Sequence, residues 1–215
     1  MKSEVNVREA AHYLGYHGSQ PDETVAAMID ECIAEVEAAA VPKSIHERFS
    51  LIFTEDDGFR VASMHLRSRS LQRNLAGCEE VYLFAATLGI AVDTLIRRTV
   101  LMDSAKGAVM QAAAAAVVET FCDEENERLR KDAAAEGLYL RPRFSPGYGD
   151  LSLSCQRDFL SLLKAQKNIG LTVTDSGLMV PIKSVTAIIG ISRENSACHL
   201  QGCEICPKTD CAFRR

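Results

Sequence analysis

A tight turn is predicted at Arg143-Phe144-Ser145-Pro146-Gly147-Tyr148-Gly149-Asp150. Pro146 fixes φ at the first central position of a β-turn, and Gly147 can adopt the positive φ that some turn types need at the second. Because Gly147 and Gly149 lack a Cβ atom, a ligand could approach their backbone closely. Arg143 supplies a planar guanidinium that suits a carboxylate or a phosphate. These residues alone leave two interpretations open, an ordinary surface turn and a ligand-binding turn.

Helices and strands mix along the rest of the chain without the regular strand–helix–strand repeat of a parallel sheet. Hydrophobic periodicity predicts helices at 6–14, 22–40, 90–100, 104–135 and 154–167, and strands at 49–55, 59–66, 81–86, 170–174, 178–180 and 184–191. An Asp57-Gly58 turn should join the first two strands as a hairpin. This pattern predicts an α+β domain.

The longest predicted helix carries a run of small side chains at 112–116, followed by Glu119. Alanines at 112, 115 and 116 share a helix face with Glu119, since they lie seven, four and three residues before it. Small side chains let another backbone or a ligand come close to the helix. Glu119 is therefore either a solvated residue on a closely packed helix or a residue that faces a ligand.

The composition describes a globular protein of 215 residues with a net charge of −5. This charge argues against a general electrostatic grip on nucleic acid. No apolar run approaches the ~20 residues that span a bilayer, and no apolar signal segment follows Met1. A cytoplasmic location is therefore expected.

The eight cysteines fall into two groups. Single cysteines at 32, 78, 122 and 155 are predicted to be small buried hydrophobic residues, because a reducing compartment disfavours disulfides. The spacing C-x4-C-x2-C-x4-C near the C-terminus favours one metal centre over free thiols. Zinc would be held by four thiolates, whereas Pro207 after the third cysteine is typical of [4Fe–4S] ligation. The predicted ligands are Cys198, Cys203, Cys206 and Cys211, with His199 as an alternative to the first.

Several motifs occur in one order along the chain. They are Thr87-Leu88-Gly89, the helix with Glu119, the turn at 143–150, and the segment 170–181 followed by Lys183-Ser184-Val185. In this order the sequence resembles the S-adenosylmethionine-binding activation domain of cobalamin-dependent methionine synthase, over roughly residues 5–192. It is more similar to the short, free-standing members, and the Arg-x-x-Pro-Gly-Tyr motif is the most specific part of the resemblance.

The resemblance implies a definite chemistry. Such a domain binds S-adenosylmethionine and presents its methyl group to the cobalt of inert cob(II)alamin, while an external reductant supplies one electron. By this resemblance Arg143 would pair with the ligand carboxylate, and Glu119 would face the ammonium or sulfonium group. The adenosyl part would lie along Ser145, Pro146 and Gly147. Tyr148 matches the family tyrosine on the cobalamin side and is the predicted catalytic residue.

The sequence also departs from the family pattern. Ala115 stands where the large enzyme has a second acidic residue one turn before the glutamate, and Gly177 stands where it has a tyrosine. No Asp-x-His-x-x-Gly motif for cobalamin occurs in the chain, so the cobalamin is expected on a partner protein.

The sequence thus predicts an activation-domain-like unit at 1–192 and a cysteine-rich tail at 193–215. The fold expected for the first unit is α+β, with a mixed, mainly antiparallel sheet, flanking helices and one long central helix. The predicted function is a stand-alone activation subunit of cobalamin-dependent methionine synthase, a methyltransferase component that needs a corrinoid protein and an electron donor. Two alternatives remain: a metal-bearing interaction or electron-transfer module for a corrinoid protein, and an S-adenosylmethionine sensor.

Overall fold

The computed structural model describes residues 7–16, 19–54 and 58–194. The helices are α1 (Val7–Tyr13), α2 (Glu23–Ala39), α3 (Arg69–Asn74), α4 (Ile90–Met102), α5 (Ser104–Ala135), α6 (Gln156–Leu162) and α7 (Ala165–Ile169), with a 3-10 turn, η1 (Leu153–Cys155). The strands are β1 (Lys43–Phe53), β2 (Phe59–Val61), β3 (Met64–Leu66), β4 (Glu80–Thr87), β5 (Tyr139–Leu140), β6 (Thr172–Val173), β7 (Met179–Val180) and β8 (Ser184–Ser192). The four predicted metal ligands, Cys198, Cys203, Cys206 and Cys211, lie outside the described residues, and the boundary at 192/193 stays a prediction.

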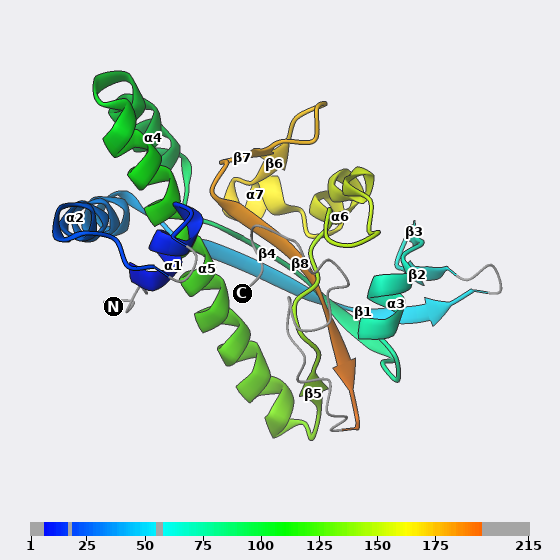
Figure 1. Ribbon diagram of the computed structural model, residues 1–215. Helices are drawn as coiled ribbons and strands as arrows, with labels where there is room; N and C mark the ends of the chain where they lie inside the picture. Colours follow the sequence, from blue (N-terminus) through cyan, green and yellow to red (C-terminus); the bar gives the residue numbers. More distant parts are fainter. Residues whose placement is uncertain (1–6, 17–18, 55–57, 195–215) are drawn as a thin grey trace.

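A six-stranded sheet with the order β3-β2-β1-β4-β8-β5 forms the centre of the fold (Figure 1). All of its described pairings are antiparallel. β4 pairs with β1 along one side, from Thr87↔Lys43 to Glu80↔Ser50, and with β8 along the other. β6 and β7 form a separate antiparallel pair. The predicted α+β class and mainly antiparallel sheet are confirmed.

Helices cover both faces of this sheet, so β4 is buried on both sides. Successive side chains of a strand point to opposite faces. One core lies between the sheet and α1, α2, α4 and α5 and includes Tyr82, Phe84 and Ala86. The other lies between the sheet and α3, α6 and α7 and includes Val81, Leu83 and Ala85. Burial on both sides explains why β4 is an unbroken apolar run in the sequence.

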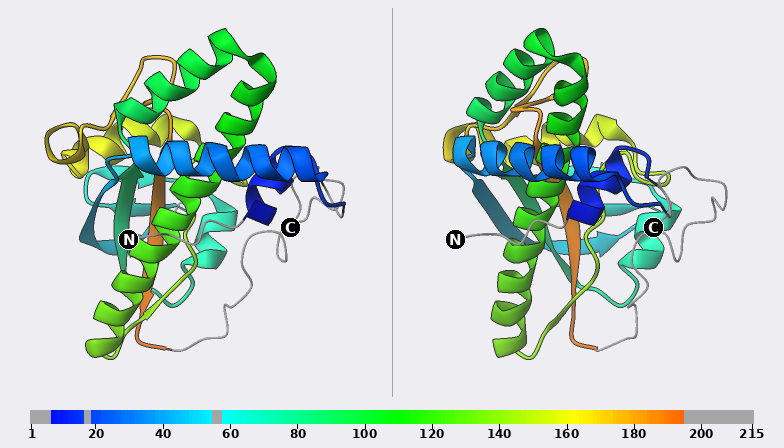
Figure 2. Two further views of the ribbon diagram at one scale, coloured as in Figure 1. Left: turned by 90° about the vertical axis from the view of Figure 1, so that its left-hand side faces the viewer. Right: turned by 60° about the vertical axis from the view of Figure 1, so that its left-hand side comes forward.

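The long helix α5 has 32 residues, which corresponds to about 48 Å at the α-helical rise. The Asp103 side chain caps it by accepting hydrogen bonds from the N–H groups of Ala105 and Lys106, each at 3.0 Å. Ala113, Ala114 and Ala116 of its alanine run are buried in the first core, and α2 crosses the helix there (Figure 2). The predicted single long central helix is confirmed, and its small side chains are used for close packing.

Two predicted elements are broken where a residue other than glycine adopts a positive φ. The predicted strand at 59–66 is a hairpin, because Val61 pairs with Met64 across a two-residue turn in which Ala62 has φ 51°. The predicted helix at 154–167 ends at Leu162, and Lys164 with φ 49° separates it from α7. Neither turn contains the glycine or asparagine that would have indicated it.

The first strand begins at Lys43, six residues earlier than predicted. Residues 43–50 pair with β4 only, and β2 joins β1 at Leu51. This half of β1 is therefore a sheet edge, where polar and charged residues are common. Residues 55–57 of the predicted Asp57-Gly58 turn lie outside the described part, although β1 and β2 do pair as a hairpin.

The four single cysteines are buried, as predicted. Burial raises the pKa of the Cys122 thiol to about 12, so this thiol stays protonated at neutral pH. None of the described helices is both long enough and apolar enough to cross a membrane.

Candidate functional site

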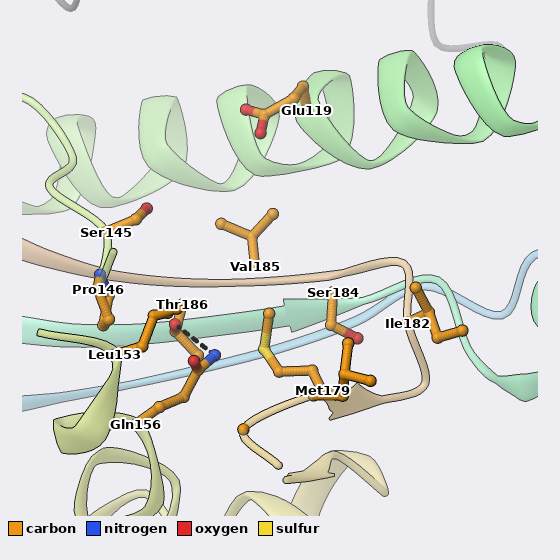
Figure 3. Close-up of a pocket in the computed structure, with 12 residues that line it drawn as sticks. Glu119, Ser145, Pro146, Leu153, Gln156, Met179, Ile182, Ser184, Val185 and Thr186 are labelled. Atoms are coloured by element: carbon orange, nitrogen blue, oxygen red, sulfur yellow. Dashed lines mark hydrogen bonds between the residues drawn. The ribbon is translucent and has the colours of Figure 1, made fainter. Parts of the chain in front are cut away.

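A cavity of about 300 Å³ opens beside α5, in the region where the predicted turn meets β8 (Figure 3). This volume is at the lower end of the range for small-molecule sites. Residues from four separate stretches of the sequence line it: Glu119, Ser145, Pro146, Leu153, Gln156, Gly177, Leu178, Met179, Ile182, Ser184, Val185 and Thr186. Figure 3 shows Glu119 on α5 at one side of the cavity and Gln156 at the opposite side.

The turn beside the cavity has the predicted geometry. The Tyr148 N–H donates to the Ser145 carbonyl at 3.1 Å, and Gly147 between them has φ 86°. With Pro146 at the first central position this is the turn type that requires a positive φ at the second. A Cβ atom at position 147 would lie 2.9 Å from Cδ2 of Leu153, which lines the cavity. Gly147 therefore serves both the turn and the close approach of Leu153.

Both ends of the turn are anchored. Before it, Phe144 exchanges two backbone hydrogen bonds with Ile188 of β8, at 2.9 and 2.8 Å. After it, the Asp150 carboxylate accepts from the Ser68 hydroxyl at 2.5 Å and from the N–H groups of Arg69 and Ser70 at 2.8 and 3.1 Å. The Ser68 hydrogen bond, with these backbone bonds, holds the pKa of Asp150 well below its usual range. Asp150 thus fixes the turn to the start of α3.

Arg143 binds two carboxylates of α5. Its Nη2 lies 3.0 Å from Oε2 of Glu119 and 2.7 Å from Oδ1 of Asp123. Nη1 is buried and has no hydrogen-bond partner among the described residues. Glu119 and Asp123 are four residues apart and therefore share one helix face. The guanidinium therefore joins the turn to α5.

Hydrogen bonds also fix the cavity wall that begins β8. The Ile182 N–H donates to Oδ2 of Asp93 at 2.7 Å, and this aspartate of α4 is buried. Ser184 Oγ lies 2.7 Å from the Pro181 carbonyl and 2.8 Å from the Thr87 hydroxyl. This wall is therefore preorganised, as precise ligand binding requires.

Gln156 forms a polar spot in the wall opposite Glu119. It is the first residue of α6 and only 3% exposed. Its Nε2 lies 3.4 Å from Oγ1 of Thr186, whereas its Oε1 has no hydrogen-bond partner among the described residues (Figure 3). A buried amide oxygen without a partner is uncommon in native proteins and calls for a physical reason.

The structure brings only some of the predicted site residues to the cavity. Glu119, Ser145 and Pro146 line it, and Arg143 contacts Glu119 but is not part of the lining. Gly147 and Tyr148 are also outside the lining. The Tyr148 ring packs edge-on against Phe144, with ring centroids 5.3 Å apart, and is 41% exposed. Within the described residues no cluster of metal-ligating side chains occurs.

Sequence reasoning missed Asp123, Gln156 and Thr186. The spacing of four residues after Glu119 could have indicated Asp123. No local signal marks Gln156, because its place at the cavity depends on how α6 packs on the sheet. Gly177 lies in a turn with φ 85°, which explains why glycine rather than a bulky residue stands there.

Comparison with known proteins identifies the class of the chain. Residues 76–202 match the family described as vitamin B12 dependent methionine synthase, activation domain. No match was found among curated proteins. The fold is similar to the crystal structure of the MetH reactivation domain bound to AdoHcy, with a TM-score of 0.61 and 17% sequence identity, covering 88% of this chain and 76% of that one.

The match includes α5, the turn and β8, and it spans more than half of the chain. The protein therefore belongs to the family of vitamin B12-dependent methionine synthase activation domains.

Proposed function

We propose that this chain binds S-adenosylmethionine in the cavity beside α5 and serves as a separate activation subunit for a cobalamin-dependent methionine synthase. The observation that carries the proposal is the convergence of Glu119 with Ser145 and Pro146 of the turn at one cavity. These residues are distant in sequence, and the resemblance of the sequence to the family assigns them to ligand binding. The related fold was crystallised with AdoHcy, the demethylated form of the same ligand.

The charges around Glu119 suit the amino-acid end of the ligand. Glu119 would attract the ammonium or sulfonium group, because a partly buried carboxylate is stabilised by a nearby cation. The ligand carboxylate would pair with Arg143 once the guanidinium turns toward the cavity, since Arg143 is outside the lining and its Nη1 is buried in the ligand-free protein. An arginine can bind several carboxylate oxygens at once, because its five donors lie in one plane.

The rim of the cavity suits a partner that carries a corrinoid. Leu153, Leu178 and Ile182 line the cavity and are exposed, at 55%, 60% and 57%. Exposed apolar groups around a polar site are typical of surfaces that another molecule covers. Tyr148 follows the same turn and would contact the corrinoid side of the complex.

The chain would hold the sulfonium of its ligand at this rim. The bound ligand would give up its methyl group as a cation and remain as S-adenosylhomocysteine. The cobalamin of the partner, after one-electron reduction by an external donor, would supply the electron pair that accepts this methyl group. Transfer requires the methyl carbon and the cobalt to come within ~3–3.5 Å of each other.

The test combines binding with reconstitution. Calorimetry with S-adenosylmethionine should give a saturable signal that Glu119→Gln weakens. Cob(II)alamin-loaded synthase that lacks its own activation domain should then form methylcobalamin only with this protein, a reductant and S-adenosylmethionine together. Tyr148→Ala should slow methylation more than it weakens binding. Binding without methylation of any corrinoid partner would replace this proposal with a sensor function, and absence of binding would refute it.

A further inference from the structure

We infer that Gln156 recognises the adenine ring of the ligand, with Oε1 accepting a hydrogen bond from the exocyclic amino group. The inference rests on the proposed function and places the adenine ring at the uncharged end of the cavity. It makes Gln156 a specificity-determining residue, distinct from the residues that bind the amino-acid end.

The first observation is the unpaired amide oxygen. Gln156 is almost fully buried, and its Oε1 has no hydrogen-bond partner among the described residues. The side chain lines the cavity, so a ligand there can reach it. Since leaving a buried acceptor unpaired is costly, a ligand that donates a hydrogen bond at this position gains affinity relative to one that does not.

The second observation is the orientation of the amide. Nε2 is directed toward Oγ1 of Thr186, at 3.4 Å. Thr186 is itself buried in β8. With the NH₂ group held in this way, the oxygen is the amide atom that remains for the ligand. Glutamine and adenine make complementary hydrogen bonds, because adenine has an amino donor beside ring-nitrogen acceptors.

The third observation is the polarity of the cavity from end to end. Glu119 lies at one side and provides a charged group (Figure 3), and Arg143 contacts it from outside the lining. Around Gln156 the apolar lining residues are Leu153 and Met179 (Figure 3). A flat, uncharged ring suits this side, and a methionine sulfur packs well against aromatic edges. The adenosyl part therefore belongs at Gln156 if the amino-acid part is at Glu119.

The experiment compares two ligands and two variants by calorimetry with the full chain. The ligands are S-adenosylhomocysteine and its purine-riboside analogue, which lacks only the 6-amino group. Wild type should bind the amino form about tenfold or more tightly, because the analogue leaves Oε1 unpaired. Gln156→Met, of similar length, should bind the two ligands with nearly equal affinity. Gln166→Met is the matched control, because it makes the same substitution at an exposed position of α7 outside the cavity lining, and it should keep the wild-type ratio.

Each outcome bears on a definite claim. If wild type binds both ligands equally, or if Gln156→Met keeps the wild-type ratio, Gln156 does not read the amino group, although the proposed function stands. If wild type binds neither ligand, the proposed function fails, and the assignment of Gln156 fails with it. Should Gln156→Met not fold, Thr186→Val provides the second test, since it frees the amide to rotate and should reduce the same ratio. An unchanged ratio in a folded Thr186→Val variant would then overturn the inference.

Discussion

Arg143 contacts two carboxylates, and we predict that the more distant one stabilises the fold more. The contact with Asp123 is the shorter, at 2.7 Å against 3.0 Å for Glu119, so distance alone would favour Asp123. Solvent exposure favours the opposite order, because the Asp123 side chain is 71% exposed and those of Glu119 and Arg143 are 31% and 17% exposed. Exposed ion pairs contribute only about 0.2–1 kcal/mol. A partly buried, charged hydrogen bond contributes about 1.5–3 kcal/mol.

Double-mutant cycles measure the two coupling energies directly. The variants are Arg143→Met, Glu119→Met and Asp123→Ala, alone and in the two pairs that include Arg143. Urea-induced unfolding followed by circular dichroism gives the free energy of unfolding, provided that the slope m is unchanged. We expect about 1.5–3 kcal/mol of coupling for Arg143 with Glu119 and less than about 1 kcal/mol for Arg143 with Asp123. Raising the salt concentration should remove most of the second value and little of the first.

Equal coupling energies, or a larger value for Asp123, would refute this reasoning. Either result would mean that short distance outweighs exposure at this position. The orientation of Arg143 in the ligand-free protein would then depend on an exposed contact, and the ligand carboxylate would compete mainly with Asp123 for the guanidinium.

Three further predictions concern the turn, its anchor and the tail. Gly147→Ala should destabilise the fold by about 1–3 kcal/mol and weaken ligand binding. Gly137 also has a positive φ, of 72°, but open space surrounds it, so Gly137→Ala should cost less stability and leave binding unchanged. Equal effects of the two substitutions in thermal melts and calorimetry would contradict this prediction. The lowered pKa of Asp150 means that its contribution is present at neutral pH and is lost as the pH falls below about 4, the usual range for an aspartate. Asp150→Asn should therefore cost about 1 kcal/mol at pH 7, and a cost that stays constant in urea titrations down to pH 3 would rule the mechanism out. Anaerobically purified protein should contain either about one zinc or a brown iron–sulfur cluster at Cys198, Cys203, Cys206 and Cys211, and metal analysis that finds neither would exclude both sites.

The sequence predicted those parts of the fold that have a local signal. The apolar run of β4, the cap and length of α5, and the turn at Pro146-Gly147 all depend on neighbouring residues, and all were found where expected. The breaks at Ala62 and Lys164 were missed, because tertiary packing places a positive φ on residues without a turn signal.

The residues of the candidate site likewise include some that the sequence predicted and some that it did not. Motif residues such as Glu119 and Ser145 were predicted from the resemblance, and the structure brings them to one cavity. Gln156 and Thr186 were not predicted, because they come from a helix start and a strand that are adjacent only after the sheet has formed. Pairing between distant elements leaves no periodic pattern in a single sequence.

Helix α5 can present two acidic residues to the site from either of two pairs of positions. Residues 115 and 119 share a face, and so do 119 and 123, because each pair is four residues apart. In this chain position 115 is alanine and the second acid is Asp123. This change places the second carboxylate on an exposed part of the helix, where it pairs with Arg143 and does not line the cavity. Among the described residues Glu119 is then the single acidic residue in the cavity lining, and Arg143 already contacts it. Under the proposed function, the cation of the ligand would therefore compete with Arg143 for Glu119, unless the ligand carboxylate draws the guanidinium toward itself. The amino-acid end of the ligand should accordingly bind as a zwitterion. Its ammonium group would pair with Glu119 and so release Arg143, and its carboxylate would pair with Arg143 and so release Glu119.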